Sequence, residues 1–176
     1  MPLNLTKKYP ELLEIGDLPE GGRISSLRRI FERDIENHPN LIFNEKSIRP
    51  IKGEEPSMQL LFRHLTTEEI EVNDENGKKY KRRIFEIHRS MRLHWIKVHL
   101  DKSLSDHLEI FSTIERVDGK NANRTYIYNV KYKYVIVLEP QRSGMDYYLL
   151  SAYYLNREYG EKMMKKKMKN KLAKLL

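Results

Sequence analysis

The clearest structural signal in this sequence is the series Thr125-Tyr126-Ile127-Tyr128, Tyr134-Val135-Ile136-Val137-Leu138 and Tyr147-Tyr148-Leu149-Leu150-Ser151-Ala152-Tyr153. All three segments are rich in tyrosine and β-branched residues, which suit the pleated surface of a half-buried sheet. Upstream of them, residues 108–114 alternate with period two, and the turn signal Asp118-Gly119 follows. A period of two indicates strands, so residues 108–154 are predicted to form a meander of antiparallel strands.

The residues before this meander carry three helical patterns. In each of them, apolar residues recur at steps of three and four, as they do on one face of an α-helix. The predicted helices cover residues 23–38, 56–65 and 86–102. A short helix is also expected at residues 10–15, among turns that proline and glycine introduce.

Two further segments lie between these helices. Residues 40–56 are predicted to be irregular or extended, because proline and glycine interrupt any regular pattern there. Residues 69–72 and 79–85 have the pattern of two strands, and Asn76-Gly77 between them is a strong turn signal. A β-hairpin is therefore expected between the second and third helices.

The last part of the chain has an amphipathic helical pattern, with lysines around one apolar stripe. The residues of this stripe are Met164, Met168, Leu172 and Leu175. Helices thus come first, strands next and a helix last, an order that predicts an α+β fold rather than alternating α/β units. The expected organisation is a helical extension at 1–44, a central domain at 45–157 and a basic amphipathic tail helix at 158–176.

The charge of the chain is concentrated at its end. The 176 residues include 33 Lys and Arg against 25 Asp and Glu, a formal net charge of +8. Residues 161–176 hold seven Lys and one Glu, so +6 of this charge lies in the tail. This distribution predicts a near-neutral body with an appendage that seeks polyanions. The tail helix is expected to add affinity for RNA, to associate with a second copy, or to lie on an acidic membrane surface.

Several classes of protein are excluded by what the sequence lacks. Without cysteine there is no disulfide, no thiolate nucleophile and no Cys-type zinc site. No apolar run of about 18 residues and no secretory leader are present, so we expect a cytoplasmic protein without a membrane span. There is also no Gly-rich phosphate loop and no Gly-x-Ser-x-Gly elbow. His94 and His99 would lie about 140° apart on a helix, so neither a metal nor another cofactor is expected.

Residues 82–97 concentrate Arg, His and Lys side chains. In one interpretation they form a solvated helix face whose Trp95 packs into the core. In the other they bind phosphate, because Arg forms paired hydrogen bonds with phosphate and His moves protons near neutral pH. The tyrosines of the strands are ambiguous in the same way: they are core residues with wet hydroxyls, or rings that stack on RNA bases.

Together these segments resemble a known family. The similarity runs through His94-Trp95-Ile96-Lys97, the three Tyr-rich strands and the ending Ser151-Ala152-Tyr153-Tyr154. On these residues the chain resembles the phage-associated barnase/EndoU/colicin/RelE-like nucleases, over roughly residues 45–157. The resemblance implies a small α+β domain in which helices precede a curved antiparallel sheet. It also implies metal-independent RNA cleavage with the neighbouring 2′-hydroxyl as nucleophile.

Such cleavage needs a base, an acid, and cations that neutralise the developing phosphorane charge. The residues expected in catalysis are His94, His88, Arg92, Lys97, Ser151 and Tyr153, and those expected in substrate binding are Arg89, Arg83, Thr125, Tyr126 and Tyr148. His94 is the favoured proton-transfer group because the resemblance runs through it, and His88, closer to the helix start, is the alternative. About 240° would separate the two on one straight helix, so they cannot easily act together.

Two classes of function follow from these expectations. The first is an endoribonuclease, such as a phage or mobile-element toxin, with RNA as substrate and a cognate inhibitor protein as a second partner. The second is a non-catalytic RNA- or protein-binding module on the same fold. Digestion of RNA by the purified protein in EDTA separates the two.

Overall fold

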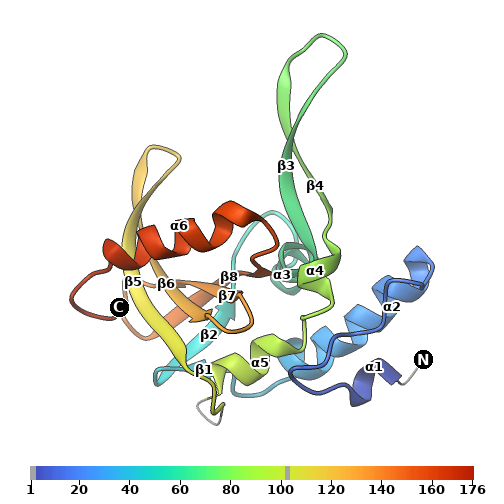
Figure 1. Cartoon of the computed structure of the whole chain (residues 1–176), viewed down its shortest axis with the longest axis horizontal. Helices are drawn as coiled ribbons and strands as arrows, with labels where there is room; N and C mark the ends of the chain where they lie inside the picture. The colour runs from blue at the N-terminus through green and yellow to red at the C-terminus, as the bar shows by residue number, and fades with distance from the viewer. Residues whose placement is uncertain (1–2, 102–103) are drawn as a thin grey trace.

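The computed structural model describes residues 3–101 and 104–176 of the chain. Its helices are α1 (Leu3–Thr6), α2 (Glu20–Phe31), the π-helical turn η1 (Glu32–Glu36), α3 (Ser57–Thr66), α4 (Ile87–Ser90), α5 (Trp95–Leu100) and α6 (Glu158–Lys169). Its strands are β1 (Ile42–Phe43), β2 (Lys46–Pro50), β3 (Thr67–Asn73), β4 (Lys79–Phe85), β5 (Leu108–Val117), β6 (Lys120–Asn129), β7 (Tyr134–Pro140) and β8 (Asp146–Tyr154). Figure 1 shows their arrangement, which confirms the predicted α+β class.

The predicted meander forms most of a curled six-stranded sheet with the strand order β1-β2-β8-β7-β6-β5. The strands from β5 to β8 pair as antiparallel neighbours, as their period of two predicted. β5 and β6 are joined by Asp118 and Gly119, whose φ angles of 48° and 77° are those of a tight hairpin turn. β8 bulges at Leu150, because Val137 pairs with Ser151 while Leu138 pairs with Leu149.

The expectation of an entirely antiparallel sheet is wrong at one strand pair. β2 pairs with β8 in parallel, with Ile48 opposite Tyr147, and β1 continues the sheet beyond β2. Both strands lie in residues 40–56, where proline and glycine obscure any strand pattern. A parallel pair joins segments that are distant in sequence, so no local pattern indicates it.

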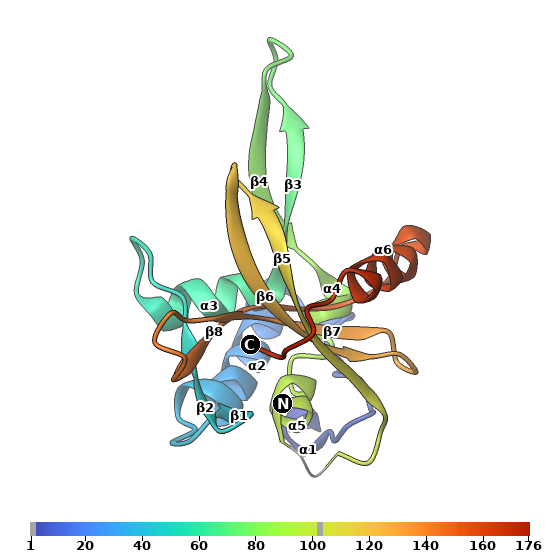
Figure 2. The same ribbon diagram turned by 90° about the vertical axis from the view of Figure 1, so that its left-hand side faces the viewer.

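The predicted hairpin is formed by β3 and β4 and is a separate two-stranded sheet. It rises from the body on the same side as the β5–β6 hairpin (Figures 1 and 2). Acidic residues of β3 pair with basic residues of β4: Glu71 lies 2.8 Å from Lys79, and Glu69 lies 3.1 Å from Lys81. Opposite charges across the two strands favour this register.

The predicted helix at 86–102 is broken into α4 and α5. Between them, the N–H groups of Arg92 and Leu93 donate to carbonyl oxygens three residues earlier, so the chain turns more tightly than an α-helix. The short helix expected at 10–15 is also absent. Instead, the Leu13 N–H donates to the Met91 carbonyl at 2.9 Å. The broken helix and the missing helix have one cause, because the N-terminal segment packs against the turn between α4 and α5.

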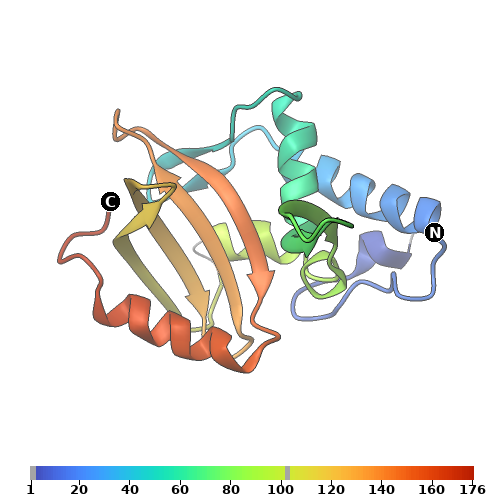
Figure 3. The same cartoon turned by 90° about the horizontal axis from the view of Figure 1, so that it is seen from above.

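One hydrophobic core joins the N-terminal helices to the sheet. Leu27 and Phe31 of α2 belong to the same buried cluster as Ile136 of β7 and Leu149 of β8. Figure 3 shows α1 to α5 grouped together, with α6 set apart from them along the sheet. The boundary expected near residue 44 therefore falls within a shared core rather than between two cores.

The tail is helical only as far as Lys169, so the expected helix over residues 158–176 is wrong for residues 170–176. Met164 is 1% exposed and packs in a second buried cluster on the opposite face of the sheet from α2. Beyond the helix, the Leu172 N–H donates to the Ser112 carbonyl on the edge strand β5. This unpaired edge offers acceptors that an extended chain can use. None of the helices in the described part of the chain is long and apolar enough for a membrane crossing.

Candidate functional site

The short helix α4 is positioned by a carboxylate that the sequence patterns did not single out. Glu86 precedes the helix, and its side chain accepts hydrogen bonds from the N–H groups of His88 and Arg89, both at 2.9 Å. A side-chain acceptor at this position satisfies N–H groups that a helix start otherwise leaves unpaired. The cap fixes the direction of a helix with a single turn, and it directs Arg89 and Arg92 toward the end of β8.

Arg89 is held where α4 meets the sheet. Its Nη1 donates to the carbonyl oxygens of Thr67 and His64 at 2.7 and 3.1 Å, and to Ser151 Oγ at 3.5 Å. Its guanidinium carbon lies 5.8 Å from the centre of the Tyr153 ring. Burial lowers the pKa of Arg89 from its ordinary value. Its Nε is buried and makes no hydrogen bond to any described residue, since the nearest carboxylate oxygen of Glu86 is 3.6 Å away.

Arg92 is more deeply buried, with 8% of its surface exposed. Its guanidinium lies 3.9 Å from the centre of the Tyr154 ring and 5.2 Å from that of Trp95. Its Nη1 donates to the His88 carbonyl at 2.7 Å, but its Nε has no hydrogen-bond partner in the part of the chain that the structure describes. No carboxylate among the described residues forms an ion pair with it. Burial lowers its pKa, and the aromatic faces supply only part of the stabilisation that a carboxylate would give.

These contacts bring together six side chains, which we call the α4–β8 cluster. Its members are His88, Arg89, Arg92, Ser151, Tyr153 and Tyr154. The His88 ring is exposed and lies 5.9 Å from the Tyr154 ring. Five of the six were candidates from the sequence, and Tyr154 was named only as part of the strand ending. The cluster thus combines two desolvated cations, hydroxyl groups and an exposed imidazole.

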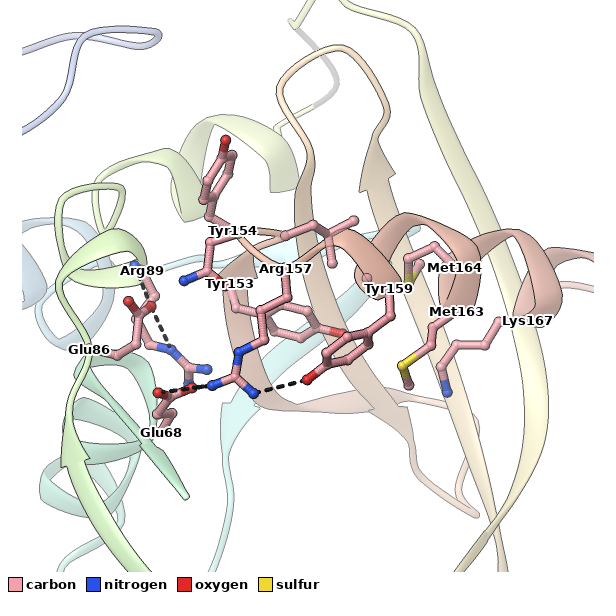
Figure 4. Close-up of a pocket in the computed structure, with 13 residues that line it drawn as sticks. Glu68, Glu86, Arg89, Tyr153, Tyr154, Arg157, Tyr159, Met163, Met164 and Lys167 are labelled. Atoms are coloured by element: carbon pink, nitrogen blue, oxygen red, sulfur yellow. Dashed lines mark hydrogen bonds and ion pairs between the residues drawn. The ribbon is translucent and has the colours of Figure 1, made fainter. Parts of the chain in front are cut away.

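A cavity of about 190 Å³ opens beside the cluster, between the base of the β3–β4 hairpin and α6 (Figure 4). It is lined by Glu68, Glu86, Arg89, Tyr153, Tyr154, Leu155, Asn156, Arg157, Tyr159, Gly160, Met163, Met164 and Lys167. Arg157 lies between Glu68, at 3.4 Å, and the Tyr159 hydroxyl, at 2.9 Å. Burial raises the pKa of Tyr153 to about 12, so this hydroxyl remains protonated at neutral pH and can donate a hydrogen bond.

His94 and Lys97 lie apart from this cluster. His94 is 3% exposed and lines a different cavity, together with Lys97. Within the described residues, no hydrogen bond, ion pair or ring contact joins either of them to a member of the α4–β8 cluster. Burial lowers the pKa of His94 to about 4, so the imidazole is neutral at pH 7. The break between α4 and α5 separates the two groups of residues, which a continuous helix would have kept on adjoining turns.

The residues predicted to bind substrate also lie in separate places, some beside the α4–β8 cluster and others away from it. Arg83 adjoins the cluster, because its Nη2 donates to the same Thr67 carbonyl that Arg89 uses, at 3.0 Å. Thr125 is completely buried against Ser112, with 2.8 Å between their hydroxyl oxygens. The Tyr126 hydroxyl donates to Glu115 under α6, and Tyr148 lines a separate polar cavity near the β7–β8 loop. Arg83 alone of these residues is placed to assist the cluster.

The cavity also contains charged residues that sequence reasoning missed, chiefly Glu68, Glu86 and Arg157. The usual N-cap residues are Ser, Thr, Asp and Asn, so no sequence signal marked Glu86 as the cap of α4. Glu68 and Arg157 come together only through the packing of the hairpin against the end of β8. No group of three or more His, Asp or Glu side chains in residues 3–101 and 104–176 could hold a metal ion.

No protein-family model, curated protein or solved structure matches the chain.

Proposed function

We propose that this protein is an endoribonuclease that cleaves RNA without a metal ion, by attack of a 2′-hydroxyl on the adjacent phosphate. The observation that carries the proposal is the pair Arg89 and Arg92. The Arg89 side chain is 11% exposed and Arg92 is 8% exposed; Arg89 lies on α4 and Arg92 on the turn that follows it. Among the described residues, neither Nε has a hydrogen-bond partner. Guanidinium groups that are already desolvated and fixed cost little reorganisation when a phosphate gains charge. The resemblance to small RNA-cleaving domains is consistent with this arrangement.

The roles within the cluster follow from exposure and chemistry. His88 has an imidazole open to solvent beside Tyr154, so it is the group assigned to proton transfer at the 2′-hydroxyl or the leaving oxygen. Arg89 and Arg92 neutralise the phosphorane, and Ser151 with Tyr153 orient the phosphate. His94, the favoured residue in the sequence, is replaced in this role by His88, because no contact among the described residues joins His94 to the α4–β8 cluster, whereas His88 lies beside Tyr154.

The test is digestion of a defined RNA by the purified protein in EDTA. We expect His88→Ala to lower the cleavage rate by about 10²–10⁴-fold, the usual effect of losing one general acid or base. His107→Ala is the matched control, since the His107 side chain is exposed and its one ion pair among the described residues is with Glu109. Equal rates for wild type and His88→Ala, with a loss in His94→Ala, would return the role to His94. Cleavage that depends wholly on added Mg²⁺ would reject the proposed chemistry.

A second function, RNA binding without cleavage, is favoured by one specific observation. The cavity is lined by the ion pair between Arg157 and Glu68, and α6 packs over the face that carries Tyr153, so the walls are already paired and packed. Protein that binds RNA but does not cleave it in the same assay, with weaker binding in Arg89→Ala, would support this alternative.

A further inference from the structure

The helix α6 forms one wall of the cavity beside the α4–β8 cluster. Tyr159, Met163 and Lys167 lie along the face of α6 that lines this cavity, across from Arg89 (Figure 4). The cavity measures about 190 Å³, whereas pockets that take ligands of nucleotide size usually measure about 300–1,000 Å³. With α6 in this position, the cavity is therefore too small to take a nucleotide of the proposed RNA substrate.

Few buried residues attach α6 to the sheet. Of its twelve residues, all of which the structure describes, Gly160 and Met164 are buried. Met164 packs against Tyr126 and Val135 in the second cluster, and the helix lies so close to Leu155 that a Cβ at Gly160 would be 3.2 Å from it. By contrast, α2 buries three large apolar residues in the main core. Separation of α6 from the sheet consequently exposes less apolar surface than opening of the main core.

Ion pairs near both ends of α6 add to this attachment. Before its first turn, Arg157 lies 3.4 Å from Glu68, but the Arg157 side chain is 53% exposed and such pairs contribute little. Near its end, Lys167 lies 2.6 Å from Glu115, which also accepts a hydrogen bond from the Tyr126 hydroxyl. The firmer of the two attachments is therefore near the C-terminal end of the helix.

The chain after α6 ties this end of the helix to the sheet. We call residues 170–176 the latch, and Figure 3 shows it turning back beside β5. The Leu176 N–H donates to Ser112 Oγ at 3.0 Å. The Leu176 carbonyl accepts hydrogen bonds from Thr125 Oγ1, at 3.4 Å, and from the Tyr147 hydroxyl. Ser112, Thr125 and Tyr147 are each at most 1% exposed, so three buried hydroxyl groups converge on the main chain of one residue.

The latch and α6 occupy opposite faces of the sheet. Tyr147 belongs to the main core on the α2 face, whereas Met164 packs on the other face. Between them, the chain passes round the edge strand β5. At its other end, α6 is joined to β8 through the exposed residues Asn156 and Arg157. Because both ends of the helix are tethered, it can turn away from the cavity only after the latch is released.

We propose that α6 is a lid over the ribonuclease site and that the latch keeps it closed, an inference that rests on the proposed function. Asn156 and Arg157 are the hinge. Release of Leu176 from the three hydroxyls lets α6 turn away from Tyr153, which enlarges the cavity for a nucleotide. The closed lid is autoinhibitory, because the apparent affinity for RNA is reduced to the extent that the open state is rare.

Movement of the lid is tested by thiol labelling, since the chain contains no cysteine. Met164→Cys places a single thiol under α6, and Ala152→Cys places one in the main core. Met164 and Ala152 are 1% and 2% exposed, so a soluble disulfide reagent reaches either position only when the structure opens. We expect Met164→Cys to be labelled at least about 100-fold faster than Ala152→Cys, because a lid opens without unfolding of the body. Equal labelling rates would overturn the proposal.

The latch is tested with Tyr147→Phe, which removes one hydroxyl and keeps the ring. Loss of one hydrogen bond should raise the open fraction, and with it the labelling rate of Met164→Cys, by about 2–10-fold. Ser112→Ala is a second latch variant with the same expected effect. Tyr132→Phe is the matched control, because Tyr132 is also partly buried but lies outside the latch and the cavity lining. An unchanged labelling rate in both latch variants would show that residues 170–176 do not hold the lid.

Binding of a 2′-O-methyl trinucleotide, which the proposed mechanism cannot cleave, connects the lid to the site. Its affinity should rise by the same factor of about 2–10 in Tyr147→Phe and should stay at the wild-type value in Tyr132→Phe. Higher affinity without cleavage of RNA by any variant in EDTA would support the lid and reject the proposed ribonuclease. Equal affinity in wild type and Tyr147→Phe would show that α6 does not control access to the site, and would overturn the inference.

Discussion

Acidification from pH 7 to pH 5 should destabilise this protein through His94, and replacement of His94 by phenylalanine should remove that effect. The folded-state pKa of His94 is about 4 because the ring is buried, whereas in the unfolded chain it is close to 6.5. The unfolded state therefore binds the proton more readily. The stability that neutral His94 allows is nearly complete at pH 7, decreases as the pH falls through 6.5, and reaches its lower limit below pH 4.

The magnitude follows from the two pKa values. The loss of unfolding free energy that is attributable to His94 is about 0.2 kcal/mol at pH 7, about 2 kcal/mol at pH 5 and about 3 kcal/mol well below pH 4. Most carboxylates remain ionised at pH 5, so they contribute little to the change in unfolding free energy between pH 7 and pH 5. His99 is also buried, and burial lowers its pKa as well, so it should add to the acid loss in the same direction.

The assay is urea unfolding followed by Trp95 fluorescence at pH 7, 6 and 5, in a buffer without phosphate. We expect the change in unfolding free energy between pH 7 and pH 5 to be about 2 kcal/mol smaller in His94→Phe than in wild type. His107→Phe serves as the control for the same substitution at an exposed position, because the His107 side chain is 78% exposed. Identical pH dependence in wild type and His94→Phe would refute the assignment of the acid loss to a buried, neutral His94.

Three further predictions concern the site and the tail. His88→Ala should reduce RNA cleavage in EDTA by about 10²–10⁴-fold with an unchanged unfolding midpoint, and a rate equal to that of His107→Ala would contradict it. Met164→Ala should lower the free energy of unfolding by about 2–5 kcal/mol, because Met164 is buried under the sheet; a loss below about 0.5 kcal/mol in denaturant titrations would show that α6 is only loosely attached. Replacement of the exposed Lys162, Lys165 and Lys166 by glutamine should reduce the slope of log affinity for RNA against log salt by about 2, and an unchanged slope would show that these lysines do not contact RNA.

Predictions from local pattern succeeded where an element depends on neighbours in the sequence. The alternation of residues 108–114 and the turn Asp118-Gly119 indicated the β5–β6 hairpin, and the structure confirms both. The structure also confirms α3, which was predicted because its apolar residues recur at steps of three and four. In each case, the side-chain period and the turn chemistry are properties of a short segment, so the segment's own residues are sufficient evidence.

The candidate site was predicted in part. Arg89, Arg92, Ser151 and Tyr153 were named from residue type and resemblance, and the structure brings them together. The location of His94 outside this cluster could not be predicted from residue type or resemblance. It depends on a helix break that local pattern did not indicate, and a continuous helix would have kept His94 one half-turn beyond Arg92.

The sequence by itself determined the α+β class, the antiparallel meander and the basic, Tyr-rich character of the site, because period, turn chemistry and composition are local properties. Only the tertiary structure decided that β2 joins β8 in parallel and that α4 ends at Ser90. It also decided that His88, rather than His94, lies beside Tyr154 at the end of β8. Each of these outcomes depends on contacts between residues far apart in the chain, such as the hydrogen bond from Leu13 to Met91. Such contacts stabilise conformations that the local residues alone do not favour over a continuous helix.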